Sequence, residues 1–251
     1  MPELPEVESL RRILARTAVG RTIVRARIGA KSLRRRVPID FSASIAGRRI
    51  TKLSRRAKYL IVEFDGDDVL LVHLGMSGSL THRRADFRIG EFDPRHDHLE
   101  FSLDDDSRLV YNDPRRFGMV RLIARVALSA TAELKGLGPE PLSRQFNAAF
   151  LASKARGRRV AIKNLLMDQR IVAGIGNIYA AEILFRAGVR PTRRAGTTFR
   201  SYRDSRGEPG RFAERLRVYG REGKPCYTCS TPIKNVVVGA RASFYCPKCQ
   251  R

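Results

Sequence analysis

Apolar residues near the N-terminus recur at the spacing of one helix face. These residues are Val7, Leu10, Ile13 and Leu14. Pro5 stands where the first turn would begin, Glu6 and Glu8 follow it, and arginines lie toward the end of the segment. Proline and acidic side chains favour a helix N-terminus, and basic side chains favour its C-terminus. The pattern therefore predicts a helix over residues 5–16.

Short runs rich in β-branched and aromatic residues come next, separated by turn residues such as "DGDD" and "DDDS". The predicted strands cover residues 22–28, 59–64, 69–74, 98–103, 108–111 and 119–123. Many short strands in succession are typical of a β-sandwich or barrel. We expect this part of the chain to extend to about residue 125.

Helical periodicity replaces the strand pattern after "GLGPEPL", with predicted helices over residues 146–155, 160–168 and 177–188. Beyond Gly220 the remaining stretch is too short to fold on a hydrophobic core alone. The expected fold class is α+β with two domains. The expected parts are an N-terminal helix plus β-sandwich domain (1–130), a C-terminal helical helix-two-turn-helix domain (131–220) and a four-cysteine zinc finger (221–251).

The chain is strongly basic, with 49 Lys and Arg against 25 acidic residues and a formal net charge of +24. Because such an excess repels itself unless anions neutralise it, a nucleic acid is the expected partner. An anionic membrane is the weaker alternative, since no segment has a clear amphipathic, lipid-facing pattern. No apolar run is long enough to span a membrane and no signal peptide is evident. We therefore expect a cytoplasmic, nucleoid-associated protein.

The four cysteines form two C-x2-C pairs that are sixteen residues apart. They are Cys226, Cys229, Cys246 and Cys249. Two such knuckles offer four thiolates to one tetrahedral Zn²⁺, and a site with four protein ligands is closed and structural. Two disulfides are the alternative, which the absence of export signals disfavours. The basic hairpin between the pairs could present Arg241 to a phosphate, or Arg241 could be an ordinary solvated arginine.

The stretch "VAGIGNIYAAE" begins like a dinucleotide-binding fingerprint, but the bulky Tyr179 stands where a third small residue should be. A helix precedes it and no parallel strand follows, so we expect no nucleotide cofactor. A pair of helices joined by a glycine turn fits better. The start of the second helix would offer free N–H groups to a DNA phosphate. Asn177 would add a side-chain contact, or would simply cap the helix.

Two further stretches, "HLGMSG" and "DPRRFG", place a large apolar side chain among turn residues. Met76 and Phe117 would be exposed at loop tips beside arginines, where apolar side chains can wedge between bases. Ordinary packing within a turn is the alternative. His96 and His98 are expected on one face of a strand, but no third ligand for a metal is apparent.

The first residues offer a nucleophile. Removal of Met1 would leave Pro2 as a secondary amine, and an α-amino pKa of about 8 leaves part of it neutral near pH 7. Attack on a sugar C1′ would give an iminium ion, which is permanently cationic and promotes strand-breaking elimination. Glu3 and Glu6 are then candidate proton carriers. A proline that merely precedes a helix is the alternative.

Taken together, these stretches resemble the bacterial formamidopyrimidine-DNA glycosylase family over nearly the whole chain. The matching motifs are "MPELPEVE", "RRAKYL", "HLGMSG", "DPRRFG", "GIGNIYA", "VYGREGKPC" and the four-cysteine motif. The resemblance implies an enzyme that excises oxidised purines such as 8-oxoguanine and formamidopyrimidines, then cleaves by β- and δ-elimination. It implies a monomer that binds double-stranded DNA, flips the damaged nucleotide out of the duplex and holds one structural zinc.

The resemblance also implies roles for individual residues. Catalytic roles fall on Pro2 as nucleophile, Glu3 as acid/base at the sugar, Glu6 as supporting carboxylate, Lys58 as a phosphate-contacting lysine, and Arg241. His73, Asn177 and Arg241 would hold backbone phosphates. Met76, Arg115 and Phe117 would fill the gap in the duplex and probe the opposite base, next to Arg116. Residues 205–219 resemble the loop that covers the extruded lesion.

One departure from the family pattern follows "GVRPTRR", where a further helix is expected and Arg194 instead leads almost directly into "AGTTF". Either a helix has been lost or the sequence is shortened there. Two rival functions stay open. An endonuclease VIII-like glycosylase for oxidised pyrimidines shares the fold, the Pro-Glu start and the zinc motif, although several motifs lean away from it. A catalytically silent binder of damaged DNA is the other.

Overall fold

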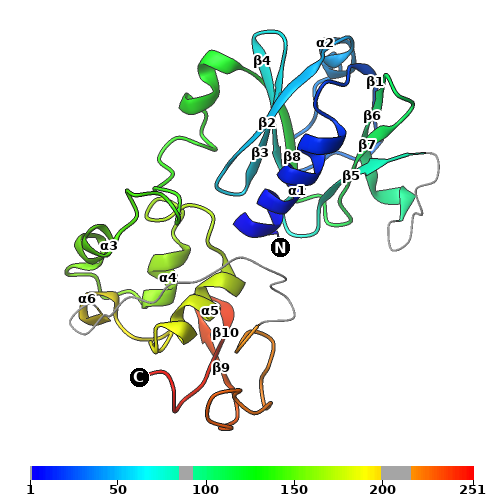
Figure 1. Cartoon of the computed structure of the whole chain (residues 1–251). Helices are drawn as coiled ribbons and strands as arrows, with labels where there is room; N and C mark the ends of the chain where they lie inside the picture. Colours follow the sequence, from blue (N-terminus) through cyan, green and yellow to red (C-terminus); the bar gives the residue numbers. More distant parts are fainter. Residues whose placement is uncertain (1, 85–92, 199–215) are drawn as a thin grey trace. The chain divides into compact units, whose positions relative to one another are not determined.

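The computed structural model describes residues 2–84, 93–198 and 216–251. The chain forms two compact units, residues 1–135 and residues 136–251 (Figure 1). Each unit buries a hydrophobic core of its own. Among the described residues, no helix is both long and apolar enough to cross a membrane.

The first unit begins with α1, Leu4–Thr17, which confirms the predicted N-terminal helix. Glu3 is its N-cap residue, and Glu3 and Glu6 form a capping box at the first turn. Val7 and Leu14 are the buried side chains of this helix. The capping box therefore fixes the start of the helix at Leu4.

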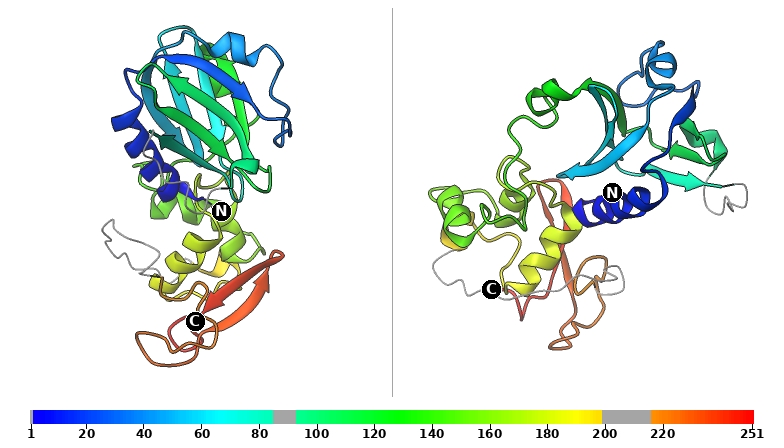
Figure 2. Two further views of the ribbon diagram at one scale, coloured as in Figure 1. Left: turned by 90° about the vertical axis from the view of Figure 1, so that its right-hand side faces the viewer. Right: turned by 45° about the horizontal axis from the view of Figure 1, so that its top comes forward.

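Two antiparallel four-stranded sheets follow and form the predicted sandwich, with strand orders β1-β6-β7-β5 and β2-β3-β4-β8. The first sheet comprises β1 (Ile23–Ile28), β5 (Ser79–Arg83), β6 (Asp97–Leu103) and β7 (Arg108–Asn112). The second comprises β2 (Ile50–Arg56), β3 (Tyr59–Phe64), β4 (Asp68–His73) and β8 (Met119–Ala124). The main core takes buried residues from both sheets, among them Leu60, Val62, Phe101 and Tyr111. Helix α1 contacts β2, β3 and β5, and so touches both sheets (Figures 1 and 2).

Two strands and the short helices of this unit were not apparent from the sequence. Strand β2 buries only Ile50 and Leu53 among mostly polar residues, and β5 has the sequence "SLTHR". Polar side chains on the solvent face of an antiparallel sheet hide such strands from a search for apolar runs. The short helices are α2 (Phe41–Ile45), η1 (Pro94–His96) and η2 (Arg125–Ala130).

The second unit contains four helices and one hairpin among its described residues. They are α3 (Ala148–Ala155), α4 (Ile162–Met167), α5 (Asn177–Arg186), α6 (Ala195–Thr198), β9 (Lys234–Val238) and β10 (Arg241–Tyr245). The predicted helices are confirmed for α3, α4 and α5, which are shorter than their apolar patterns. Apolar side chains of α4 and α5 share a core, and α5 also contacts β10 (Figure 2).

Candidate active site and nucleic-acid interface

The N-terminal candidates lie at the first turn of α1. The Glu3 side chain is only 1% exposed, whereas Pro2 is half-buried. The backbone N–H of Glu3 donates to Glu6 Oε2 at 2.9 Å, so the Glu6 carboxylate fixes the backbone one residue after Pro2. A carboxylate at this end also interacts favourably with the helix dipole. This arrangement could orient Pro2, the candidate nucleophile, and place the Glu3 carboxylate one residue away in the chain.

Lys58 and His73 influence each other electrostatically. Lys58 lies in the short connection between β2 and β3, is 8% exposed, and follows Ala57, whose φ is +53°. His73 ends β4 and stacks on Tyr59, with ring centroids 4.8 Å apart. Burial, followed by the charges of Lys58 and Arg34, lowers the pKa of His73 to about 4. The imidazole is consequently neutral at neutral pH.

The tautomer of His73 follows from its hydrogen bond. The backbone N–H of Gly75 donates to His73 Nδ1 at 3.1 Å, so Nδ1 is the acceptor. In the neutral ring the proton is then on Nε2. This nitrogen can donate to a phosphate oxygen without the ring having to become charged.

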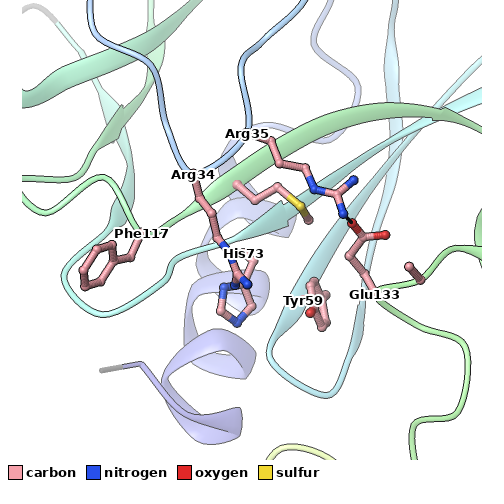
Figure 3. Close-up of a pocket in the computed structure, with 8 residues that line it drawn as sticks. Arg34, Arg35, Tyr59, His73, Phe117 and Glu133 are labelled. Carbon is pink, nitrogen blue, oxygen red and sulfur yellow. Dashed lines mark ion pairs between the residues drawn. The ribbon is translucent and has the colours of Figure 1, made fainter.

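A cavity of about 210 Å³ opens next to His73 in the first unit (Figure 3). Its walls include Arg34, Arg35, Tyr59, His73, Phe117 and Glu133. Arg35 pairs with Glu133 at 3.0 Å, and Arg121 pairs with the same carboxylate at 2.8 Å. Burial opposes ionisation of Glu133, but its backbone hydrogen bond and the two arginines lower its pKa overall. Arg34, which sequence reasoning did not single out, lies beside His73 in the close-up.

The two predicted loop tips are exposed, with Met76 at 40% and Phe117 at 48%. Both residues are exposed, as predicted for loop tips. The Arg115 guanidinium lies 4.8 Å from the centre of the Phe117 ring, within the range of a cation–π contact. Arg116 is also exposed and adopts a φ of +57°. An exposed aromatic side chain therefore lies beside two arginines.

In the second unit, the expectation that Asn177 caps a helix is wrong. Gly176 is the N-cap residue of α5, and Asn177 is the first helical residue. The amide of Asn177 donates to the Ala242 carbonyl at 3.2 Å, next to the exposed Arg241 on β10. Its Oδ1 is buried and accepts no hydrogen bond from the described residues. Asn177 therefore joins the start of α5 to the hairpin instead of closing the helix end.

Lys163 is a functional candidate that the sequence did not suggest. This α4 lysine is fully buried, and its Nζ donates to the Ala242 carbonyl at 2.9 Å and to Ser243 Oγ at 2.6 Å. A buried ammonium ion is costly unless it is hydrogen-bonded, so this contact is specific. Lys163 fixes the strand immediately after Arg241.

Of the predicted lesion-covering loop, residues 205–219, residues 205–215 lie outside the described residues and residues 216–219 are described. The backbone N–H groups of Arg217, Val218 and Tyr219 donate to the Glu182 carboxylate at 2.8–2.9 Å. Glu182 is 1% exposed, and three donors compensate its burial. This α5 residue was also missed, because an isolated glutamate in a helix is most often on the surface.

The four cysteines converge at one point. Their Sγ atoms all lie within 4.8 Å of one another, with separations of 3.9, 3.5 and 3.4 Å for three pairs. Four sulfurs at about 2.3 Å from a tetrahedral zinc would be about 3.8 Å apart, whereas a disulfide needs about 2.05 Å. The thiols are free, so the site fits one zinc ion and the disulfide alternative is wrong. The zinc is structural because all four positions are filled by protein.

The two histidines of "RHDHLE" do not share a strand face. His96 ends the short helix η1, before β6 begins. His98 is buried on β6, with Nε2 2.9 Å from the Asp113 carbonyl. The expectation of a shared strand face is wrong because Asp93 and Pro94 start a 3-10 turn at this point.

Models of three protein domains match the chain. They are the formamidopyrimidine-DNA glycosylase N-terminal domain (residues 1–120), the formamidopyrimidine-DNA glycosylase H2TH domain (137–201) and a zinc finger found in FPG and IleRS (223–251). The second of these describes the helical pair that the glycine turn predicts.

Curated relatives and solved structures agree with these matches. A formamidopyrimidine-DNA glycosylase of Cereibacter sphaeroides is 42% identical over 285 aligned positions, and one of Methylococcus capsulatus is 43% identical over 278. Each alignment covers both chains completely, so both relatives contain segments with no counterpart in the 251 residues here. The chain is also similar to a Lactococcus lactis Fpg bound to abasic-site DNA, at 30% identity, full coverage of both chains and a TM-score of 0.86.

Proposed function

Because this chain belongs to the formamidopyrimidine-DNA glycosylase family, whose enzymes act on damaged DNA, we propose that it excises oxidised purines from duplex DNA. The proposed substrates are 8-oxoguanine and formamidopyrimidines, and the proposed second step cleaves the strand by β,δ-elimination. The observation that carries this proposal is the buried Glu3 carboxylate, next to Pro2 in the chain and at the start of α1.

Pro2 is the proposed nucleophile once Met1 has been removed. Its nitrogen attacks C1′ of the damaged nucleotide, and the bond from C1′ to the base breaks. Opening of the sugar ring places a negative charge on O4′, which Glu3 neutralises by donating a proton. The resulting iminium ion acidifies C2′, so the Glu3 carboxylate, now deprotonated, removes a C2′ proton, and the electrons of that C–H bond form a double bond as the 3′ phosphate leaves. Loss of the 5′ phosphate follows in the δ step.

Four side chains have proposed contacts with DNA phosphates. In the first unit these are Lys58 and the neutral, Nε2-protonated His73; in the second they are Asn177 and Arg241. The Oδ1 of Asn177 can only accept hydrogen bonds and so cannot bind a phosphate oxygen; the proposed contact is made by its amide NH₂ group. The formal charge of +24 supports binding to DNA in general, and it predicts a strong dependence on salt.

The exposed loop tips have a proposed role in reading the duplex. Met76 and Phe117 fill the gap left by the flipped nucleotide, and Arg115 reads the base opposite the lesion, with Arg116 beside it. An arginine offers adjacent donors. Cytosine presents O2 and N3 as adjacent acceptors, whereas adenine presents an acceptor beside an amino group. Arginine therefore favours a lesion that is opposite cytosine, which should be repaired, over one that is opposite adenine, which should not.

Replacing Arg115 by alanine should remove most of this preference. In the wild type, excision of 8-oxoguanine opposite cytosine should exceed excision opposite adenine by about tenfold to a hundredfold, the value of one bidentate contact to a base. The ratio is measured by single-turnover excision on both duplexes. Cleavage of a preformed abasic site should be largely retained in Arg115→Ala, because Pro2 is untouched.

A matched control is Arg12→Ala, which removes another exposed arginine, from α1. This variant should keep the wild-type preference. If Arg115→Ala also keeps it, another residue reads the opposite base.

A second substrate class follows from one relative. A Lactococcus lactis Fpg, 30% identical and with a TM-score of 0.87, was solved with DNA that contains an oxidised pyrimidine. Parallel assays on duplexes with 8-oxoguanine and with an oxidised pyrimidine therefore test the endonuclease VIII-like alternative. Preferential nicking of the pyrimidine duplex would favour that alternative, and a shifted but intact duplex would favour the silent binder.

The proposed division of labour assigns catalysis to residues 1–130, DNA binding and the lesion-covering loop to residues 131–220, and the zinc finger to residues 221–251. We propose that the protein acts as a monomer at the nucleoid, without a nucleotide cofactor. Sedimentation of the protein with and without a lesion-containing duplex tests the stoichiometry.

A further inference from the structure

A buried carboxylate joins the two loops that carry the proposed wedge. Asp113, the residue directly after β7, is fully buried. Its Oδ1 accepts a hydrogen bond from Ser77 Oγ at 2.7 Å and one from the Arg115 N–H at 3.2 Å, and its Oδ2 accepts one from the Gly118 N–H at 2.8 Å. The Arg115 N–H is also 3.3 Å from Ser77 Oγ. One side chain thus fixes both ends of the loop with Arg115 and touches the loop with Met76.

The backbone of Asp113 is fixed as firmly as its side chain. The Asp113 N–H donates to the His96 carbonyl at 3.0 Å, and the His98 imidazole Nε2 lies 2.9 Å from the Asp113 carbonyl oxygen. That carbonyl also accepts from the Arg116 N–H at 3.2 Å, which closes the turn in which Arg116 has a positive φ. The carboxylate therefore projects from a rigid position.

Tyr111 forms a second connection between the same loops. This buried residue of β7 donates its hydroxyl to the His73 carbonyl at 3.0 Å. A Cβ on Gly118 would lie 1.6 Å from the Tyr111 hydroxyl oxygen, and one on Gly75 would lie 2.6 Å from the Gly118 nitrogen. The two loops therefore approach so closely that only glycine fits at these positions.

We infer that Asp113, Ser77 and Tyr111 are positioning residues that hold the Met76 loop and the Arg115–Phe117 loop as one rigid unit. This unit sets how Arg115 meets the opposite base. The inference rests on the proposed function, because it presupposes that Arg115 reads that base. A bidentate contact needs both donors of Arg115 in place, so a shift of the loop weakens recognition of cytosine before it affects chemistry at Pro2.

The experiment compares single substitutions that weaken the hydrogen bonds of this connection. Ser77→Ala removes the hydroxyl that bridges the loops, and Ser77→Thr restores it. Asp113→Asn keeps the shape of the side chain, but it replaces one acceptor oxygen by an NH₂ group, which cannot accept a hydrogen bond from a backbone N–H such as that of Gly118. Ser79→Ala is the matched control, since Ser79 lies two residues further on and its hydroxyl contacts only the Asn112 carbonyl, at 3.4 Å, among the described residues.

The readouts are single-turnover excision opposite cytosine and opposite adenine, cleavage of a preformed abasic site, and the thermal midpoint. Ser77→Ala should lower the cytosine preference about threefold to tenfold and Asp113→Asn by about tenfold or more, as expected for lost hydrogen bonds to a charged group. Cleavage of the abasic site should stay within about twofold of the wild type. Ser77→Thr and Ser79→Ala should retain the preference.

Two results would overturn the inference: an unchanged preference in both Ser77→Ala and Asp113→Asn, or a parallel loss of excision, abasic-site cleavage and thermal stability, which would indicate a merely structural role. A wild-type enzyme with no cytosine preference, or an Arg115→Ala variant that keeps it, would instead contradict the proposed function of Arg115. The inference would fail with it.

Discussion

Replacing Glu3 by glutamine is expected to abolish excision of 8-oxoguanine while binding to the lesion-containing duplex persists. An amide cannot exchange the proton that opening of the sugar ring requires, and general acid–base catalysis contributes about 10²- to 10⁴-fold. Glutamine keeps the size of the side chain and an oxygen that can accept the N-cap hydrogen bond of α1. Single-turnover excision and a binding titration on the same duplex measure the two effects.

The matched control is Glu8→Gln on the same helix. Glu8 interacts with Arg11, Arg12 and Arg55, which lower the pKa of its carboxyl to about 2. This carboxylate stabilises the fold above the pKa of an unfolded glutamate and loses that effect as the pH falls toward 2. Glu8→Gln should therefore lower thermal stability slightly and leave excision unchanged. Normal excision by Glu3→Gln would remove Glu3 from the mechanism.

Removal of zinc has the second large expected effect. The hairpin β9–β10 has few buried apolar residues of its own, so the free energy of metal binding is folding free energy there. Without the metal the strand with Arg241 should lose its fixed position. Affinity for the lesion-containing duplex should then fall by at least about tenfold to a hundredfold, the value of a single hydrogen bond to a charged group.

The measurement combines elemental analysis, which should give one zinc per chain, with DNA titrations before and after chelation. Arg241→Ala serves as the partial control, because it removes one contact and leaves the metal in place. Its loss of affinity should be smaller than that of the metal-free protein. Full affinity in a metal-free, disulfide-bonded protein would contradict the assignment.

The sequence allowed much of the fold to be predicted, because strong local signals agreed with the tertiary structure. The cysteine spacing specified the zinc site without any knowledge of the fold. The apolar runs of β3 and β4 are buried on both faces and so stand out in the sequence. Strand β2 has only two buried apolar residues and was missed, because only its pairing with β3 shows that it is a strand.

The parts of the candidate site that were missed depend on contacts between distant residues. Asp113 precedes a proline and reads as a turn residue, and only the packing of the Ser77 loop above it makes it a buried acceptor. Lys163 forms a hydrogen bond with Ser243, which is 80 residues further along the chain. Glu182 accepts one from the backbone of Arg217, which is 35 residues further along. No local pattern distinguishes such residues from surface charges.

The stretch after Arg194 packs against the helical core of the second unit. Residues Ala195–Thr198 form the short helix α6, which contacts α3 and α4. The backbone N–H of Ala195 donates to the Val160 carbonyl at 3.0 Å, so the chain re-enters the helical core at once.

The most direct test of the account is reductive trapping with borohydride during turnover of an 8-oxoguanine duplex. The iminium ion should be reduced to a stable amine, which would leave DNA covalently attached to the protein. Mass spectrometry of the digested adduct should locate the attachment on the peptide that begins with Pro2. Strand cleavage without any adduct, or an adduct on Lys58 instead of Pro2, would contradict the central claim.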